Sequence, residues 1–346
     1  MKETVKVLEL FAGLGACSKA LTNLDIDHEI VDAVEIDRFA VQSFNAIHGT
    51  NFEPQDITKW DKDIKVDLIM HGSPCQDFSV AGKGAGGDKG SGTRSSLMYE
   101  TIRIVEKLKP KYVIWENVKN LLSGKHRHNF DAYLETMEGL GYKSCYQVLN
   151  AKDYGVPQNR ERVFTVSVLG ENNFEFPEKQ ELLIRLKDIL DEDVDDKYYL
   201  TDAQIERLKT TTFNSQKYEV RIQGDIARTL LARDYKDPKC IQVGQIYGTE
   251  REPNPQAGRV YSADGISPTM DTCSGGNRMP KVTSGPRIRK MTPKECWRLM
   301  GFDDEDFEKA EKVNSSSQLY KQAGNSIVVN VLEAILKGIF KEGYGK

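Results

Sequence analysis

Cys75 is a cysteine with polar neighbours, in the segment HGSPCQDFS of residues 71–79. This segment follows a short apolar run and precedes a glycine-rich stretch. Open α/β sheets bind their ligands at this position, beyond the carboxyl end of a strand. A thiol there is a candidate nucleophile, provided that its surroundings favour the thiolate or supply a base. A buried, unreactive cysteine is the alternative that the residue type alone leaves open.

Charged side chains stand at the ends of two further apolar runs. Glu116 lies in the segment WENV of residues 115–118, where a carboxylate is either an acid and hydrogen-bonding group or the cap of a helix. Arg160 and Arg162 lie in the segment QNRERVF of residues 158–164. Strand alternation predicts that they share one face, where two guanidinium groups suit phosphate or carbonyl oxygens. Surface salt bridges are the alternative.

A glycine turn near the N-terminus has the pattern of a nucleotide-binding loop. Residues 8–21, LELFAGLGACSKAL, run from a strand through Gly13 and Gly15 into a helix, and these glycines allow the backbone to approach a ligand closely. Glu35 follows 22 residues after Gly13, at the end of the next predicted strand, where an acid suits ribose hydroxyls. Ser18 replaces the third glycine of a nicotinamide-dinucleotide fingerprint. A nicotinamide dehydrogenase fits the first 40 residues and nothing after them.

Elements of alternating type must position these residues. The first 170 residues alternate apolar runs with segments of helical period, and this βαβα order predicts a mostly parallel sheet with helices on both faces. The predicted strands cover residues 5–10, 30–36, 66–70, 112–115 and 162–169, and the predicted helices cover residues 17–24, a segment from Arg38 and residues 97–108. Near the C-terminus, residues 292–300 and 326–340 are predicted to be helical.

The middle of the chain departs from this alternation. Residues 175–206 hold eleven Asp and Glu against four Lys and Arg, whereas residues 207–290 hold fifteen Lys and Arg against eight Asp and Glu. The second block is rich in Gly, Pro, Ser and Thr and has no helical period, which predicts irregular structure or short strands. Its charge suits the phosphates of a nucleic acid, or else forms a solvated surface. The glycine-rich residues 82–92 are predicted to be mobile.

Composition sets the outer limits of the interpretation. A chain of 346 residues predicts two domains, or one with a large insertion, and its net charge of −4 argues against a generally basic coat. No apolar run reaches the ~18–20 residues of a membrane span, and the first residues do not form a signal peptide, so the cytoplasm is the expected location. The six cysteines form no CxxC pair and no zinc spacing, which predicts free thiols and no metal site.

Taken together, these motifs resemble those of the DNA (cytosine-5-)-methyltransferase family, of the small bacterial or phage type. The chain presents, in that family's order, FAGLG, EID, QDIT, GSPCQDFS, ENV, QNRERVF, RKMTPKECWRLMGF and QAGNSIVV, which span nearly its whole length. The resemblance implies an α/β, Rossmann-like, S-adenosylmethionine-dependent methyltransferase domain of residues 1–172, completed by residues 318–346. It also implies a smaller, irregular, β-rich target-recognition domain with a return segment, in residues 173–317.

The resemblance gives roles to the residues singled out above. Cys75 would attack carbon 6 of a cytosine, so that carbon 5 can accept the methyl group of S-adenosylmethionine through a covalent intermediate. Glu116 would bind ring nitrogen 3 and the exocyclic amine, and Arg162, supported by Arg160, would bind carbonyl oxygen 2 and the nearby phosphate. Because the base is inaccessible inside duplex DNA, it must first be flipped out.

The same resemblance implies the cofactor S-adenosyl-L-methionine, which leaves as S-adenosyl-L-homocysteine, and no metal. Glu35 would take the ribose hydroxyls, Asp56 and Ile57 would hold the adenine, and Asn325 and Ser326 would close the site. The full set of implied cofactor-binding residues is Phe11, Gly13, Leu14, Gly15, Glu35, Ile36, Asp56, Ile57, Gly72, Pro74, Leu97, Asn325 and Ser326.

Contacts with double-stranded DNA are implied at Gln76, Ser79, Gln256, Arg259 and Thr269. Residues 255–270, PQAGRVYSADGISPTM, resemble the recognition loop of small bacterial enzymes that methylate within GC-rich sites. Gln256 would fill the gap left by the flipped base, and Arg259 would read a guanine edge. Ala81 stands where the family often has a small polar residue that enters the vacated stack, which weakens the case for gap-filling by that loop.

Two alternatives stay open. A tRNA cytosine-5 methyltransferase shares the Pro-Cys-Gln and Glu-Asn-Val blocks, but it normally lacks a recognition domain of this size and carries a Cys-Phe-Thr signature that is absent here. A non-catalytic DNA-binding relative is disfavoured by the intact Cys75, Glu116 and Arg162. A monomer is expected, because each event modifies one cytosine, and a cognate restriction endonuclease, where there is one, would act separately.

Overall fold

A six-stranded sheet organises the first half of the chain, in the order β2-β1-β3-β4-β7-β5. The computed structural model describes residues 4–74, 94–201, 242–245, 259–272, 279–284 and 287–340. The strands of the large sheet are β1 (Val5–Leu10), β2 (His28–Val34), β3 (Leu68–His71), β4 (Tyr112–Val118), β5 (Tyr142–Asn150) and β7 (Glu161–Leu169). Neighbours among β2, β1, β3 and β4 are parallel, whereas β7 runs antiparallel to both β4 and β5.

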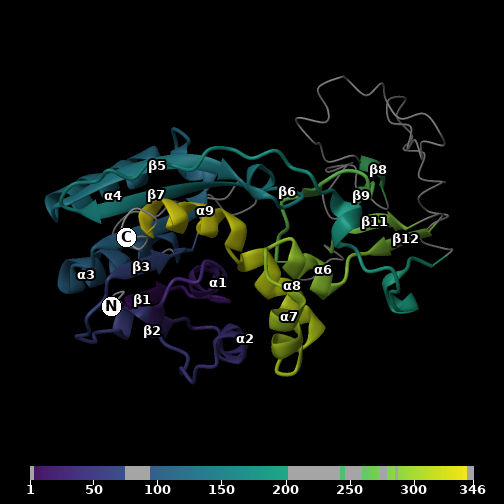
Figure 1. Ribbon diagram of the computed structural model, residues 1–346, viewed down its shortest axis with the longest axis horizontal. Helices are drawn as coiled ribbons and strands as arrows, with labels where there is room; N and C mark the ends of the chain where they lie inside the picture. The colour runs from purple at the N-terminus through teal and green to yellow at the C-terminus, as the bar shows by residue number, and fades with distance from the viewer. Residues whose placement is uncertain are drawn as a thin grey trace.

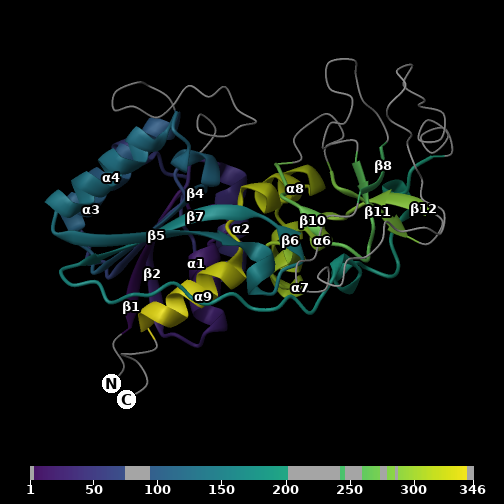
Figure 2. The ribbon, with the colours of Figure 1, turned by 90° about the horizontal axis from the view of Figure 1, so that it is seen from above.

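Helices cover both faces of this sheet, and each face has its own apolar core (Figure 1, Figure 2). The helices α1 (Ala16–Asn23) and α9 (Val329–Phe340) pack on one face, and α3 (Met98–Leu108) and α4 (Arg127–Gly139) pack on the other. Alternate residues of β3 enter different cores, with Leu68 and Met70 on the α1 side and Ile69 on the α3 side. The predicted α/β class and mostly parallel sheet are therefore confirmed.

A second, smaller sheet lies at the far end of the molecule, in the order β12-β11-β9-β8 (Figure 1). Its strands are β8 (Gln242–Gln245), β9 (Arg259–Tyr261), β11 (Lys281–Ser284) and β12 (Arg287–Lys290). The two-residue strand β10 (Ser267–Pro268) pairs instead with β6 (Gln158–Asn159), which directly precedes β7. The described parts of the basic block, residues 207–290, thus contain short strands, as predicted. One of these strands, β10, pairs with β6, which directly precedes strand β7 of the large sheet.

Three helices lead from the small sheet back to α9: α6 (Pro293–Arg298), α7 (Asp304–Glu311) and α8 (Ser316–Asn325). Thr292 caps the N-terminal end of α6, where its hydroxyl accepts a hydrogen bond from the backbone N–H of Glu295 (3.2 Å). α7 is fixed to α1 because Nζ of Lys19 lies 2.6 Å from Asp303 and 2.8 Å from Asp306. The chain also contains α2 (Arg38–His48) and short 3-10 turns at Ile57–Lys59, Arg94–Leu97, Lys119–Leu122, Ala151–Tyr154, Leu186–Ile189 and Asp196–Tyr198.

Several boundaries differ from the prediction. β2 ends at Val34, which leaves Glu35 beyond the strand, and α9 begins at Val329 instead of residue 326. β4 continues to Val118 because β7 pairs with it as far as Arg162. Antiparallel pairing of this kind depends on a distant strand, so the local run of apolar residues does not show it.

α4 and β5 are not predicted from the local sequence pattern. α4 buries Phe130, Tyr133 and Met137 as its large apolar residues, which is a weak helical stripe. β5 forms the edge of the sheet next to β7, and several of its residues are exposed. Both elements are stabilised mainly by packing against neighbouring elements. The local order of apolar and polar residues does not indicate that packing.

Within the described part of the chain, no single helix is long and apolar enough to cross a membrane. The pair α8 and α9 passes the same test by length and composition, with a bend of 41° between the two helices.

Candidate active site

The glycine turn after β1 adopts backbone conformations that side chains rarely tolerate. Phe11, Gly13 and Gly15 have φ angles of 56°, 56° and 75°. A Cβ atom on Gly15 would lie 2.2 Å from Nε2 of His48, so no side chain fits there. Phe11 packs, together with Leu97, against the core on the α3 side of the sheet. The turn therefore presents backbone atoms at the edge of the sheet, as close binding of a nucleotide requires.

His48, the last residue of α2, contacts this turn through its imidazole ring. Its Nε2 atom lies 3.0 Å from the carbonyl oxygen of Leu14. Burial lowers the pKa of His48 to about 4, so the ring is neutral near pH 7 and its Nε2–H donates to that carbonyl. The sequence alone does not identify this residue, because a single histidine at a helix end carries no signal of its own.

Glu35 reaches back to the same turn from the end of β2. Its carboxylate accepts hydrogen bonds from the backbone N–H groups of Gly13 (3.2 Å) and Asp37 (2.8 Å). Burial raises the pKa of Glu35, and these hydrogen bonds oppose the rise. The neighbouring Ile36 is 71% exposed, and an exposed large apolar side chain beside a carboxylate suits the flat face of a ring joined to a sugar.

Asp56 and Ile57 lie beside Glu35, because the backbone N–H of Gln55 donates to the Glu35 carbonyl oxygen (2.8 Å). The Asp56 carboxylate accepts hydrogen bonds from the hydroxyl (2.8 Å) and the backbone N–H (3.0 Å) of Thr58, and these bonds lower its pKa. The structure thus brings predicted cofactor-binding residues from β1, β2 and the segment before β3 to one edge of the sheet.

Glu116 and Arg162 form a largely buried ion pair across β4 and β7. Nε of Arg162 lies 3.1 Å from Oε1 of Glu116, and the two side chains are 17% and 11% exposed, respectively. Removal from water raises the pKa of Glu116, while the positive charges of Arg162 and Arg160 oppose the rise. A carboxyl group in this setting holds a proton more readily near neutral pH than an exposed one does.

The segment before Cys75 lies against this pair. A Cβ atom on Gly72 would lie 3.7 Å from Oε2 of Glu116. Ser73 is anchored to β4, because Nε1 of Trp115 donates to its Oγ (3.0 Å) and Nδ2 of Asn117 donates to its carbonyl oxygen (3.2 Å). The sequence alone does not identify these two anchors, which join residues more than 40 positions apart.

Pro74 is the last described residue of this segment. The predicted residues that lie outside the described part of the chain are Cys75, Gln76, Ser79, Ala81 and Gln256, together with residues 82–92. Among the residues that are described, no group of three or more His, Cys, Asp or Glu side chains is placed to hold a metal ion.

Arg160 lies in the turn between β6 and β7 and is 4% exposed. Its guanidinium group donates to the carbonyl oxygens of Met270 (3.1 Å), Gly324 (3.1 Å) and Ser326 (2.9 Å). Arg160 therefore joins the start of β7 to Met270 and to the end of α8. At that helix end Asn325 is exposed and Ser326 is buried.

Residues 269 and 270 are joined to β6 by further hydrogen bonds. The hydroxyl of Thr269 donates to the carbonyl oxygen of Asn159 (2.7 Å), and the backbone N–H of Met270 donates to Oε1 of Gln158 (3.4 Å). Arg259 begins β9 and is the register partner of Gln245 in β8. Residues 267–270 therefore contact β6, the short strand that lies just before Arg162 in the chain.

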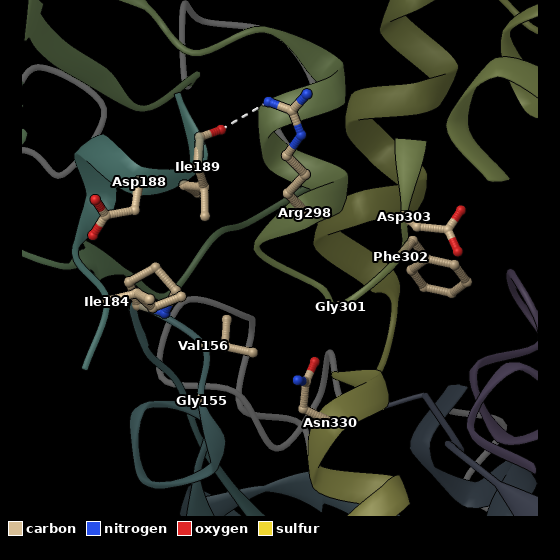
Figure 3. A pocket seen from close by; sticks show the side chains of 11 residues that line it. Gly155, Val156, Ile184, Asp188, Ile189, Arg298, Gly301, Phe302, Asp303 and Asn330 are labelled. Atoms are coloured by element: carbon tan, nitrogen blue, oxygen red, sulfur yellow. Dashed lines mark hydrogen bonds between the residues drawn. The ribbon is translucent and has the colours of Figure 1, made fainter. Parts of the chain in front are cut away.

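A cavity of about 280 Å³ lies apart from these residues, between the segment after β5 and the helices α6 and α9 (Figure 3). Its polar lining includes Arg298, which already donates to the carbonyl oxygen of Ile189 (2.9 Å) and to Asp191 (2.8 Å) and Asp304 (2.7 Å). None of the predicted site residues lines this cavity. It is therefore separate from the candidate active site.

The sequence matches the family model of the C-5 cytosine-specific DNA methylases over residues 5–341. The chain belongs to this family. The methylase is 33% identical to the type II methyltransferase M2.ScrFI of Lactococcus lactis subsp. cremoris, over 97% of this chain and 99% of that protein. It is 34% identical to the type II methyltransferase M.HhaI of Haemophilus parahaemolyticus, over 97% and 94%, and 32% identical to the orphan methyltransferase M.SPBetaI of Bacillus phage SPbeta, over 96% and 97%.

Solved structures agree on the fold. The methylase is similar to the Dnmt2 methyltransferase of S. pombe, with a TM-score of 0.68 at 17% identity over 99% of this chain and 100% of that one. It is also similar to a DNA modification methyltransferase encoded within an E. coli prophage, with a TM-score of 0.66 at 20% identity over 98% and 99%. The family, the Rossmann-like methyltransferase fold and the cytosine-5 DNA methyltransferase activity that the motifs predict are confirmed.

A pH-dependent stability of this methylase is expected from Glu9 in β1, which is 3% exposed and accepts a hydrogen bond from the backbone N–H of Ser18 (3.0 Å). Burial raises the pKa of Glu9 from 4.5 to about 7. A raised carboxyl pKa stabilises the fold at low pH, and that contribution is lost as the pH rises from about 4.5 to about 7. The full difference corresponds to about 3 kcal/mol.

We therefore expect Glu9→Gln, which cannot ionise, to lose less stability between pH 5 and pH 8 than the wild type, by up to about 3 kcal/mol. Urea unfolding of both proteins at the two pH values measures this difference, and groups that titrate alike in both proteins cancel. An equal pH dependence in the two proteins would show that Glu9 does not change its protonation over this range.

Proposed function

We propose that this methylase acts on a cytosine flipped out of duplex DNA, with S-adenosylmethionine as methyl donor and Cys75 as nucleophile. The observation that carries the proposal is the Glu116–Arg162 pair, which lies against Gly72, three residues before Cys75. The glycine turn and Glu35 follow the carboxyl ends of neighbouring strands, β1 and β2, of the same sheet as β3. A donor site and a base site on neighbouring strand ends are what methyl transfer between two bound molecules needs.

The residues present fit S-adenosylmethionine. Glu35 has carboxylate oxygens for the ribose hydroxyls, Ile36 offers an exposed apolar surface for one face of the adenine, and Asp56 offers an acceptor for its amino group. The backbone of Gly13 and Gly15 leaves room for the rest of the molecule. When bound, S-adenosylmethionine supplies an electrophilic methyl group. The remaining residues proposed to hold it are Phe11, Leu14, Ile57, Gly72, Pro74, Leu97, Asn325 and Ser326.

The chemistry of the base begins at Cys75. Its thiolate forms a bond to carbon 6 and moves the electron pair of the 5,6 double bond toward carbon 5, which is too weak a nucleophile without this step. Carbon 5 then accepts the methyl group, a base removes the carbon-5 proton, and loss of the thiolate restores the aromatic ring. Ser73, anchored to Trp115 and Asn117, fixes the backbone that leads into Cys75.

Glu116 and Arg162 stabilise the charge that develops on the ring. A protonated Glu116 donates to ring nitrogen 3 as the thiol adds, and its other oxygen accepts from the exocyclic amine. Arg162 is proposed to turn from Glu116 to carbonyl oxygen 2 and the adjacent phosphate when the base enters. Arg160 donates hydrogen bonds to three backbone carbonyl oxygens, and these bonds hold the start of β7 in place.

The DNA-reading residues are proposed from the family pattern. Gln256 would fill the gap and pair with the orphan guanine. Arg259 and Thr269 would contact the DNA from residues 255–270, and Gln76 and Ser79 would contact it beside Cys75. Residues 1–172 with 318–346 would form the catalytic domain, and residues 173–317 the target-recognition domain with its return segment. Relatives are named both type II methyltransferases and orphan phage methyltransferases. We therefore propose that the methylase protects DNA from restriction, or marks it, in a bacterial cytoplasm or a phage-infected host. It would act as a monomer, with any cognate endonuclease acting separately.

The proposal is tested by bisulfite sequencing of DNA from a host that expresses the full chain. We expect 5-methylcytosine at one short recurrent sequence. Incubation of the purified protein with tritium-labelled S-adenosylmethionine and either duplex DNA or total tRNA identifies the nucleic acid. Label in tRNA alone would reject DNA as the substrate, and no label in either would indicate a non-catalytic relative.

We expect Arg259→Ala to relax the choice of base at one position of the recognition sequence and to weaken binding there by about 1–3 kcal/mol, because a guanidinium group binds a guanine edge through two hydrogen bonds. The measurement is methylation of a randomised duplex library followed by sequencing of the products. Arg287→Ala is a matched control, since Arg287 is exposed on the same small sheet and pairs with Asp196 (3.0 Å). An unaltered site preference with uniformly weaker binding would place Arg259 on a phosphate.

A further inference from the structure

Residues 55–60, the segment proposed to receive the adenine ring, are held by a side chain of α3. The segment contains only a three-residue 3-10 turn, Ile57–Lys59, and so short a turn is not stable without outside contacts. Nη2 of Arg103 donates to the carbonyl oxygens of Ile57 (3.0 Å) and Trp60 (2.9 Å). One nitrogen of the guanidinium group thus joins the beginning and the end of the turn.

The guanidinium group of Arg103 is itself oriented. Its Nε donates to Oε2 of Glu100 (2.8 Å), which lies one turn earlier on α3. Because the guanidinium group is planar, a hydrogen bond at Nε restricts the directions in which Nη2 points. A lysine at this position has a single charged nitrogen and could not hold Glu100 and both carbonyl oxygens in the same geometry.

Asp32 of β2 holds the ends of the same segment from the other side. Its buried carboxylate accepts hydrogen bonds from Nε1 of Trp60 (2.7 Å) and Nε2 of Gln55 (2.8 Å), and Nζ of Lys62 lies 2.7 Å away. Burial alone would raise the pKa of Asp32, but these three partners lower it, so the carboxylate stays ionised. Asp32 thus fixes residues 55 and 60, and Arg103 adds the contact at Ile57 between them.

The contact at Ile57 leads to Asp56 through one peptide group. Arg103 binds the oxygen of the Ile57–Thr58 peptide, and the N–H of that same peptide donates to Oδ1 of Asp56 (3.0 Å). A peptide group is planar, so fixing its oxygen also fixes the direction of its N–H. The direction of the Asp56 carboxylate therefore depends on Arg103.

We propose that Arg103 is a positioning residue that makes the cofactor pocket selective for a 6-aminopurine ring. It does so by aiming the Asp56 carboxylate at the amino group through the Ile57–Thr58 peptide. The inference rests on the proposed function, which places the adenine at Asp56 and Ile57. Arg103 itself does not touch the ring, so its loss changes the recognition of adenine without removing any contact to the rest of the cofactor.

Lys107, one turn further along α3, provides a matched control. Its Nζ donates to the carbonyl oxygen (3.1 Å) and to Oδ1 (2.6 Å) of Asp61. It therefore joins the same helix to the same stretch of chain, but beyond the turn that contains Asp56 and Ile57. Lys107→Met removes a cation–carbonyl contact of the same kind without touching the proposed path to Asp56.

The test measures the binding of two ligands, the reaction product and an analogue of it, by titration calorimetry with the full-length protein. One is S-adenosylhomocysteine, and the other is S-inosylhomocysteine, in which a carbonyl oxygen replaces the 6-amino group. We expect the wild type to prefer the adenosine compound by at least about tenfold, because the exchange places two acceptors face to face. Arg103→Met should reduce this preference to about threefold or less, and Lys107→Met should retain it.

The two parts of the hypothesis fail in different ways. A wild type that binds both compounds equally would reject the proposed adenine site, whatever the variants do. A selective wild type whose Arg103→Met variant binds both compounds more weakly by the same factor, or binds both unchanged, would reject the role of Arg103 alone. If Arg103→Met does not fold, Arg103→Lys decides the question: a preference between those of wild type and about threefold supports the proposal, and an unchanged preference overturns it. At saturating cofactor the turnover of Arg103→Met should stay within about threefold of wild type, which places the effect on binding.

Discussion

Cys75→Ser is expected to reduce methyl transfer by at least about 10⁴-fold, since loss of a covalent nucleophile typically has an effect of this size or larger. A serine hydroxyl has neither the acidity nor the intrinsic nucleophilicity of a thiol, so it cannot add to carbon 6 at neutral pH. Binding of S-adenosylhomocysteine should be unchanged within about twofold, because Cys75 is not among the residues proposed to hold the cofactor. Single-turnover transfer of a tritiated methyl group to duplex DNA measures the rate.

Cys145→Ser is the matched control for this variant. Cys145 is a half-buried free cysteine in β5, where its Sγ lies 3.7 Å from the carbonyl oxygen of Val166. It lies at the opposite edge of the sheet from β2, and its serine variant should methylate DNA at the wild-type rate. Trapping with DNA that carries 5-fluorocytosine adds an independent readout, because wild type and Cys145→Ser should form a covalent complex and Cys75→Ser should not. A Cys75→Ser variant that turns over within about tenfold of wild type would reject the covalent mechanism.

The first half of the fold follows closely from local patterns in the sequence. β1 and β3 are short apolar runs that end at glycines, and each is followed by residues with evident chemistry, so strand ends and site residues are found together. The antiparallel arrangement of β7 and the existence of β5 could not be predicted in this way. Their stability comes from pairing with strands elsewhere in the chain, and half-exposed edge strands show little alternation.

The candidate site shows the same division between local and distant information. Glu35 and Glu116 are candidates from the sequence because each is a carboxylate at the end of a predicted strand, whereas Asp56 is a candidate through the resemblance of QDIT to the family pattern. The partners of Arg160 could not be predicted, since Ser326 lies 166 positions away, and neither could the link from Arg103 to Ile57, which spans 46 positions. Residue type shows what a group can do chemically, but only the fold determines which carbonyl oxygens surround a guanidinium group.

Glu116→Gln is expected to slow the chemical step by about 10²–10³-fold, which is the usual effect of removing one group that stabilises developing charge. Glutamine keeps the size of the side chain and can still accept a hydrogen bond from the exocyclic amine, but it has no proton to give to ring nitrogen 3. Glu161→Gln is the matched control, because Glu161 is an exposed acid of β7 that pairs with Lys119 (3.0 Å). Single-turnover rates with saturating DNA and cofactor separate the chemical step from binding.

The pH dependence of these rates distinguishes a proton donor from a purely electrostatic contact. Burial raises the pKa of Glu116, so the wild type keeps a protonated fraction toward neutral pH and loses it as the pH rises further. Its rate should therefore decline as the pH rises and Glu116 loses its proton, whereas Glu116→Gln should not show this decline. A decline of equal size in both proteins would assign the loss of activity at high pH to another group. An unchanged single-turnover rate in Glu116→Gln would exclude Glu116 from the mechanism and leave Arg162 as the group that stabilises the charge on the ring.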